Sequence, residues 1–482
     1  MKWLTAAILC PLLLTTASAK PTDEQGREAA IFGSTVDDRD TAAETAPDGT
    51  RETALFGDDS NTRSTALDDG PEQRLSSQLD DNQDPLVIGG SLFLRTMSRL
   101  TDDMAVADMP LSQTAQVFLY GDARPTERIR AFVRGRFDHN LVDATQGTGF
   151  ATDFTTPQDG RTRALVDQLW LKFDLDRTVF LTLGQQPIRW GSARIWNPTD
   201  FVNAQRRDPL AIFDIRPGVP LVKAHIPLEK SETNIYLIGQ FDGAETISQT
   251  GGVFRIEQTI AQSELSAMVS ARQEQPLRLG LDYSLGVGLF ELRFEGAAIS
   301  GDHRHRWSGN FNPDLANLQL PERSSVEYEY QGTAGAEWTI PYGDSDSAFW
   351  TVEYFYNQLG YDGSELYPWL ALSGELTPLY LGRHYVATNL ALPRPGSWNE
   401  TTILTSAIMN LSDQTAVLRL DLQWQLLTRL RLFTYIATYV GEQGEFRFSL
   451  DVPKDANIPE LEDGLSIKPP KLDIGFWLSV TL

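Results

Sequence analysis

Residues 326–340 read VEYEYQGTAGAEWTI, and residues 348–356 read AFWTVEYFY. In the first run the even positions are apolar or small, and the odd positions are polar or glycine. Strict alternation with a period of two is typical of a strand with one apolar and one polar face. The short polar run at 342–347 predicts a turn, so the two runs are expected to form a β-hairpin.

The length and the aromatic residues of this hairpin indicate a membrane. Both strands are long enough to cross a bilayer at a tilt, which takes about 9 to 11 residues. Aromatic residues stand at the ends of the apolar face, with Tyr328 and Tyr330 at one end and Trp338 and Trp350 at the other. This pattern is typical of a transmembrane β-barrel, in which one face meets lipid and the other a water-filled interior.

The same alternation continues from Pro85 to the C-terminus and predicts an all-β fold, a transmembrane antiparallel barrel of about eighteen strands. Sixteen is the alternative count if residues 251–272 are partly loop. Strands are predicted at 113–122 and 126–139, and tight turns alternate with long connections, as periplasmic turns and extracellular loops do. No run of 18 apolar residues predicts a helical membrane span.

The N-terminal part has a different composition. Residues 1–19 combine a basic start, a short apolar run and an Ala17-Ser18-Ala19 site, which predicts a secretory signal peptide. The sole cysteine, Cys10, lies within it, so the mature chain is expected to have no disulfide or thiolate metal site. Residues 20–84 hold 17 acidic and 6 basic residues and are expected to be a disordered periplasmic segment. The barrel domain is assigned to residues 85–482.

The acidic segment contains a short repeat. The run R-E-x-A-[IL]-F-G occurs at residues 27–33 and again at residues 51–57, with Phe32 and Phe56 as its aromatic residues. Two such runs could each dock one aromatic side chain on a periplasmic partner. Chance duplication in a low-complexity linker is an equal alternative.

Closure of the barrel is supported by the last strand. From Leu472 to Leu482 every second residue is apolar, and an apolar strand that ends at the last residue is what outer-membrane assembly machinery reads. Signal peptide, strands and missing helices together predict the outer membrane of a Gram-negative cell. The expected partners are outer-membrane lipid, the assembly machinery and a polar solute, with no nucleic acid.

Alternation also predicts which side chains face the lumen. Four arginines on the lipid face would cost about 2–4 kcal/mol each near the midplane, so Arg128, Arg130, Arg134 and Arg136 are expected to point inward. The predicted pore-lining set is completed by the following residues: Glu327, Glu329, Glu337, Glu353, Arg419 and Asp421. The arginine strand and the glutamate strands should lie on opposite walls, which predicts a transverse field. The alternative is that these charges form ion pairs between neighbouring strands and stabilise the wall.

Residues 188–217 are predicted to fold into the barrel as a constriction loop. The stretch is rich in Trp, Phe and Ile and also in Arg, yet it has no lipid face. Asn197 before Pro198 predicts a short helix reaching to about Arg207. The loop residues expected to act in the constriction are Arg189, Trp190, Arg194, Trp196, Asp200, Arg206, Arg207 and Asp208. The alternative is a loop that packs only on other extracellular loops.

This loop also carries a resemblance. Residues 184–191 read GQQPIRWG and residues 196–200 read WNPTD, a pattern that resembles the G-x-Q-x-I-x-W-G and N-P-x-D runs of proteobacterial outer-membrane barrels of unassigned function. More loosely, residues 85–482 are similar to the eighteen-stranded alginate-export porins. The resemblance implies a fold and a compartment, and it implies no particular solute.

Enzyme chemistry has no support in the sequence. We find no G-x-S-x-G elbow and no H-E-x-x-H run, and we expect no catalytic residue, cofactor or metal. The predicted function is an outer-membrane channel or export porin for small or oligomeric polar solutes of anionic character. The alternative function is a non-conducting scaffold that docks periplasmic partners through the N-terminal segment.

Overall fold

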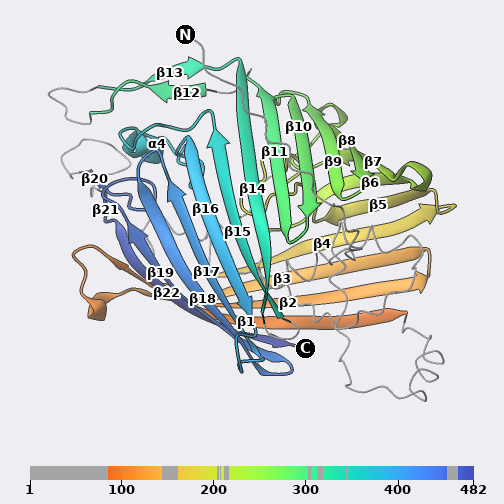
Figure 1. The fold of residues 1–482 in the computed structure, drawn as a ribbon, viewed down its shortest axis with the longest axis horizontal. Helices are drawn as coiled ribbons and strands as arrows, with labels where there is room; N and C mark the ends of the chain where they lie inside the picture. The colour runs from red at the N-terminus through yellow and green to blue at the C-terminus, as the bar shows by residue number, and fades with distance from the viewer. Residues whose placement is uncertain are drawn as a thin grey trace, which may run out of the picture.

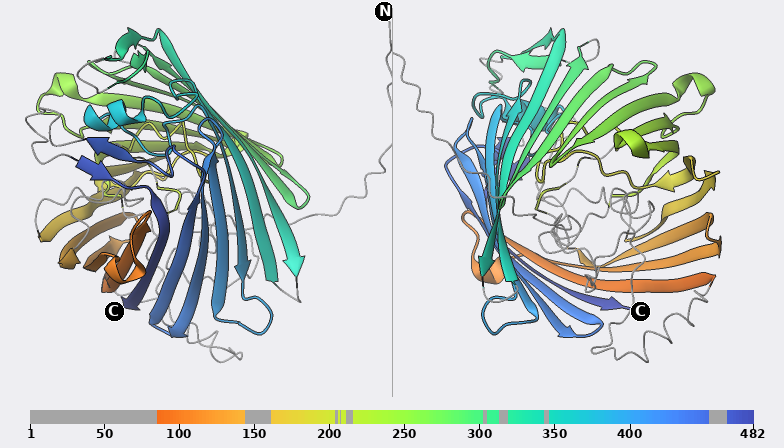
Figure 2. Two further views of the ribbon diagram at one scale, coloured as in Figure 1. Left: turned by 90° about the vertical axis from the view of Figure 1, so that its left-hand side faces the viewer. Right: turned by 45° about the vertical axis from the view of Figure 1, so that its right-hand side comes forward.

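The computed structural model describes residues 85–143, 161–203, 206, 208–210, 216–301, 305–312, 319–342, 346–452 and 465–482. In this part of the chain, eighteen antiparallel strands form one closed sheet (Figures 1 and 2). Each barrel strand pairs with the next one along the chain, and β1 (Leu86–Thr101) also pairs with β22 (Pro470–Thr481). The predicted all-β barrel of eighteen strands is therefore confirmed.

The barrel strands are 8 to 16 residues long. Those between β1 and β22 have these bounds: β2 Leu111–Thr126, β3 Ile129–Asp143, β4 Thr162–Leu175, β5 Val179–Gln186, β6 Val219–Leu228, β7 Thr233–Gln240, β8 Gly251–Ile260, β9 Ser263–Arg272, β10 Arg278–Val287, β11 Phe290–Ser300, β14 Tyr328–Tyr342, β15 Asp346–Asn357, β16 His384–Pro393, β17 Thr401–Asn410, β18 Thr415–Leu427 and β19 Leu430–Val440.

Connections at the two ends of the barrel differ in length, as predicted. Short turns such as 127–128, 261–262 and 428–429 lie at the end where β1 begins and β22 ends. Connections such as 187–218 and 358–383 lie at the opposite end. Outer-membrane barrels have short periplasmic turns and longer extracellular loops, so we assign the first end to the periplasm.

The first turn lies later than the predicted strands at 113–122 and 126–139 imply. β2 continues to Thr126 because its pairing with β3 extends through Ala123 and Ala131. The turn between β10 and β11 includes Gly288, whose φ of 62° suits glycine. Residues 251–272 form β8 and β9, which excludes the alternative of sixteen strands.

The two faces of the wall differ as the alternation predicts. Outward-facing leucines such as Leu169 and Leu281 are 56% and 60% exposed. So many apolar side chains on one face would be unfavourable in water, and contact with lipid removes this cost. Outward Tyr328 and Tyr330 stack near one rim, and Trp338 lies beside Trp350 toward the other. Inward-facing side chains, including arginines and carboxylates on β3, are mostly buried or half-buried.

Smaller elements lie in the extracellular connections. The strands β12 (His305–Ser308) and β13 (Glu322–Ser325) pair, as do β20 (Leu450–Val452) and β21 (Leu465–Ile467). Helix α4 (Tyr367–Leu372) packs its Tyr367 and Leu370 against Phe448 and Leu450. Among the described residues, no helix is long and apolar enough to cross a membrane.

The predicted signal peptide, the acidic segment and its Phe32 and Phe56 runs lie outside the described residues. Those predictions remain untested.

Candidate functional site

Residues 187–203, which follow β5, lie inside the barrel; we call them the inner segment. Their apolar side chains are buried against inward-facing residues of β6, β7, β8, β9 and β11. The members of this cluster are Ile188, Trp190, Phe201 and Val202 from the segment, and Val219, Leu221, Tyr236, Ile238, Val253, Met268 and Ala297 from the wall. The hydrophobic side chains noted in the sequence thus pack on the inner wall and not in lipid.

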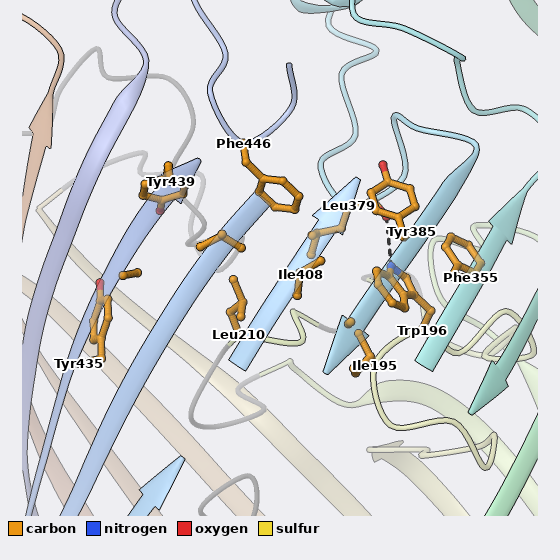
Figure 3. Packing of buried hydrophobic residues seen from close by; sticks show 13 residues of the cluster. Ile195, Trp196, Leu210, Phe355, Leu379, Tyr385, Ile408, Tyr435, Tyr439 and Phe446 are labelled. Carbon is orange, nitrogen blue, oxygen red and sulfur yellow. Dashed lines mark hydrogen bonds between the residues drawn. The ribbon is translucent and has the colours of Figure 1, made fainter. Parts of the chain in front are cut away.

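A second part of the segment packs farther round the inner wall (Figure 3). Ile195 and Trp196 join a buried cluster with inward residues of β15 to β19, and Leu210 belongs to it. The Trp196 ring stacks on Phe355, with centroids 5.3 Å apart and an interplanar angle of 11°. The segment therefore lies along the inner wall, from the β6–β11 strands to the neighbouring β15–β19 strands.

Glu353 on β15 fixes the middle of the segment. Its carboxylate accepts backbone hydrogen bonds from Arg194 at 2.9 Å and Trp196 at 2.7 Å, and from the Ile195 N–H between them at 3.2 Å. Successive N–H groups form a concave anion site. Hydrogen bonds to a charged group contribute about 1.5–3 kcal/mol each, so this contact is strong.

Glu295 on β11 fixes a second point. It accepts hydrogen bonds from the Ala193 N–H at 2.7 Å and the Thr199 hydroxyl at 2.8 Å. Gly191 has a φ of 103°, and a Cβ there would lie 2.5 Å from a Glu295 carboxylate oxygen. Only glycine fits this position, which explains the W-G pair of the motif.

Glu337 on β14 completes the covered acidic wall. Its carboxylate lies 3.3 Å from Arg194 Nε and 3.4 Å from an Arg293 terminal nitrogen. Two other predicted glutamates lie on this side. Glu329 is buried and accepts a hydrogen bond from the Gln331 amide at 2.6 Å, and Glu327 precedes β14 and is exposed.

The predicted helix from Asn197 to Arg207 is wrong for the described residues. Asn197 and Asp200 form a single turn, and the residues described beyond it are not helical. The physical reason is that the side chains of Asn197 and Thr199 bind Glu295, which holds the backbone in a turn.

The remaining predicted loop residues are scattered. Arg189 is exposed, and Asp200 pairs with Arg216 at 3.0 Å. The exposed Arg206 places its guanidinium carbon 3.7 Å from the centroid of the Tyr380 ring. Asp208 is half-buried and accepts a hydrogen bond from the Leu210 N–H. Arg207 lies outside the described residues.

The inward arginines on and beside β3 each pair with a carboxylate. The pairs are Arg128–Asp174 at 2.8 Å, Arg130–Asp122 at 2.9 Å, Arg134–Asp167 at 3.5 Å and Arg136–Asp138 at 3.3 Å. Arg419 and Asp421 form a similar pair on β18 at 2.6 Å. Ion pairs within the wall, the alternative left open by the sequence, are thus present. The side chains of Arg130 and Arg134 nevertheless stay 20% exposed.

The two charged walls lie opposite each other but differ in access. In the ring, β3 is the third strand and β14 the twelfth, so they stand half a circumference apart. On the β14 side, Glu337 and Glu353 are 1% exposed because the inner segment covers them. Arg130 and Arg134 on the arginine wall are therefore more accessible than these two glutamates.

Two contacts of the segment were not predicted. Alternation places Glu295 inward on β11 beside Arg293, as observed, but it does not indicate that Glu295 binds the segment. Leu379 accepts a hydrogen bond from Trp196 Nε1 at 3.2 Å, and its loop position gives no periodic signal. In the described part of the chain, no three His, Cys, Asp or Glu side chains gather as metal ligands would.

These features define an integral outer-membrane β-barrel. The sheet is closed, its outer face is apolar between aromatic rims, and its interior carries many charged side chains beside the two apolar clusters. Barrels with an even number of antiparallel strands of this kind belong to the outer membranes of Gram-negative bacteria.

No family model and no curated protein matches the sequence. Several solved structures are similar in fold. OccK11 (OpdR) from Pseudomonas aeruginosa is 9% identical, with a TM-score of 0.47 over 82% of this chain and 96% of that one. OccAB4 from Acinetobacter baumannii is 8% identical, with a TM-score of 0.48 over 83% of this chain and 99% of that one. A BenF-like porin from Pseudomonas fluorescens Pf-5 is 9% identical, with a TM-score of 0.48 over 82% of this chain and 98% of that one.

Proposed function

We propose that this chain is an outer-membrane channel that passes small polar solutes and prefers anions. The observation that carries the proposal is the unequal access of the two walls. The inner segment covers Glu337 and Glu353, while Arg130 and Arg134 remain partly exposed. Charged side chains that line a pore select ions by sign, so the accessible arginines favour anions.

The inner segment supplies the size limit in this proposal. A barrel of sixteen to eighteen strands leaves a wide aqueous channel unless something narrows it. Trp190 and Trp196 anchor the segment at two points on one arc of the wall, at β7 and at β15, so a solute passes between the segment and the arginine wall in this proposal. The proposal assigns no catalytic residue.

Reversal potentials in planar bilayers test the proposal. Under a potassium chloride gradient, the wild-type channel should be anion-selective, and Arg130→Glu with Arg134→Glu should shift the reversal potential toward cations. The matched control replaces both residues with lysine, which keeps the charge and should keep the selectivity. Unchanged selectivity in the glutamate variant would show that these arginines do not determine which ions the pore passes.

The solute class is proposed to include oligomeric anions, because two partly exposed arginines of one strand, Arg130 and Arg134, could bind two charges of one chain. Added oligouronates should then block the chloride current from one side in a concentration-dependent way, and neutral oligosaccharides of equal length should not. Equal block by the oligouronates and the neutral oligosaccharides would show that the channel distinguishes these solutes by size and not by charge.

A non-conducting scaffold is the second candidate, and one observation favours it. The inner segment packs on a long arc of the inner wall and occupies part of the interior, as a seal would. A scaffold predicts no conductance and a periplasmic partner whose capture is lost when Phe32 and Phe56 are changed to alanine.

A further inference from the structure

Leu379 links the extracellular loops to the inner segment. It lies in the connection between β15 and β16, at residues 358–383. Its backbone N–H donates to the carboxylate of Glu445, and its carbonyl accepts a hydrogen bond from Trp196 Nε1 at 3.2 Å. Leu379 also packs with Trp196 and Phe446 in one buried cluster (Figure 3). A displacement of Glu445 is therefore passed to Trp196 through one residue.

Glu445 gathers several elements at this point. It lies after β19 and is 9% exposed. Its carboxylate accepts hydrogen bonds from the Tyr385 hydroxyl at 2.6 Å and the Asn410 amide at 2.9 Å, while its own N–H donates to Asp413 at 2.8 Å. Residues of the connections 358–383 and 411–414 thus meet at Glu445, the first at its carboxylate and the second at its backbone N–H.

We propose that Glu445 is a positioning residue for the channel: it holds Leu379, and through Leu379 the Trp196 side chain, in the arrangement that narrows the lumen. The inference rests on the proposed channel function. It extends that function by coupling the extracellular loops to the width of the pore.

The charge state of Glu445 gives the coupling a pH dependence. Burial raises the pKa of Glu445 to about 8, and the nearby Asp413 carboxylate adds to this rise, against the hydrogen bonds from Tyr385, Leu379 and Asn410. Burial also raises the pKa values of the two other titratable groups from neighbouring loops, Asp413 and Tyr367. On the loop of Glu445 itself, Arg447 pairs with Asp102, and Glu442 is exposed.

The direction of the pH effect on the stability of the junction follows from proton linkage. The assembled junction binds the Glu445 proton more tightly than an opened junction does, because its pKa of about 8 exceeds the ordinary value of 4.5. The stabilisation from this group is complete below pH 4.5, decreases as pH rises, and is lost above about pH 8. The junction should therefore loosen, and the lumen widen, in alkaline solution.

Single-channel conductance across a pH series tests the inference in the full-length protein. Wild-type conductance should rise several-fold on passing from acid to above about pH 8. Glu445→Gln, which cannot ionise, should stay at the low value throughout, and Glu445→Ala should stay at the high value. The control Glu442→Gln changes an exposed carboxylate three residues away and should follow the wild type. A rise in Glu445→Gln equal to that of the wild type would overturn the inference.

The route through Leu379 has its own variant. Trp196→Phe keeps a ring to stack on Phe355 but removes the Nε1 donor, so the pH-dependent rise should disappear. A full wild-type rise in Trp196→Phe would contradict the coupling.

Hydrogen–deuterium exchange of residues 193–203 gives a readout independent of current. The exchange should be faster in Glu445→Ala than in Glu442→Gln at one pH, and equal rates would overturn the inference. No current in any variant, even one that lacks residues 189–216, would instead refute the proposed channel function.

Discussion

The acidic and basic walls of this barrel neutralise their charges in different ways. On the acidic side, Glu295 and Glu353 bind backbone N–H groups of a segment that comes from elsewhere in the chain. On the basic side, Arg130 and Arg134 pair with aspartates of the wall itself. A carboxylate that binds a loop is covered by it, whereas an arginine paired along the wall still borders the lumen. Lumen polarity therefore depends on the segment as much as on the strands.

Removal of residues 189–216 is the change with the largest expected effect. The link from Ile188 to Pro217 leaves β5 and β6 paired, because their register starts beyond the deleted residues. Conductance should rise many-fold since the segment no longer occupies the lumen. Heat-modifiable migration in gels serves as the control for a folded barrel, and an unchanged conductance would show that the segment does not limit the pore.

Glu353→Ala should loosen the segment without opening the barrel. Three backbone N–H groups lose their acceptor, at about 1–3 kcal/mol each if they stay buried. Limited proteolysis should cut between residues 189 and 203 in this variant and not in wild type. Glu257→Ala is the matched control, since Glu257 is equally buried but binds Asn234 and Arg255 of the barrel wall. Equal proteolysis of both variants would contradict the anchoring role.

The sequence predicts the barrel better than the segment for a physical reason. A strand between lipid and water repeats the same two environments, so the alternation of β14 and β15 alone indicates the fold. The segment contacts partners that are distant in sequence, such as Glu295 and Leu379, and its backbone follows those hydrogen bonds. For this reason the helix expected at 197–207 is absent from the described residues, while the burial of Trp190 and Trp196 follows from their hydrophobicity.

Asp473→Asn should weaken the seam that closes the barrel and leave the segment in place. Asp473 on β22 binds Arg99 on β1 at 2.6 Å and the Tyr439 hydroxyl on β19 at 2.7 Å, across the seam that closes the barrel. An amide lacks the charge and one acceptor oxygen, so we expect a loss of about 1–3 kcal/mol in the free energy of unfolding. Urea unfolding in detergent measures this free energy. If residues 189–203 also lost their protection from proteolysis, the prediction that the segment stays in place would be contradicted.

Arg128→Ala should have the smallest effect. Arg128 lies at the periplasmic turn, and its side chain is 48% exposed and paired with Asp174. Water and salt screen such a charge, so selectivity should match that of wild type. A shift in reversal potential as large as that of the Arg130 and Arg134 double variant would move the selective region to the periplasmic mouth.

The reversal potential of the variant that lacks residues 189–216 tests the central claim most directly. The deletion uncovers Glu295, Glu337 and Glu353 and leaves the arginine wall intact. The account predicts an anion-selective wild type and a clear shift toward cations in the deletion variant. A deletion variant that is as anion-selective as the wild type, or more so, would contradict it.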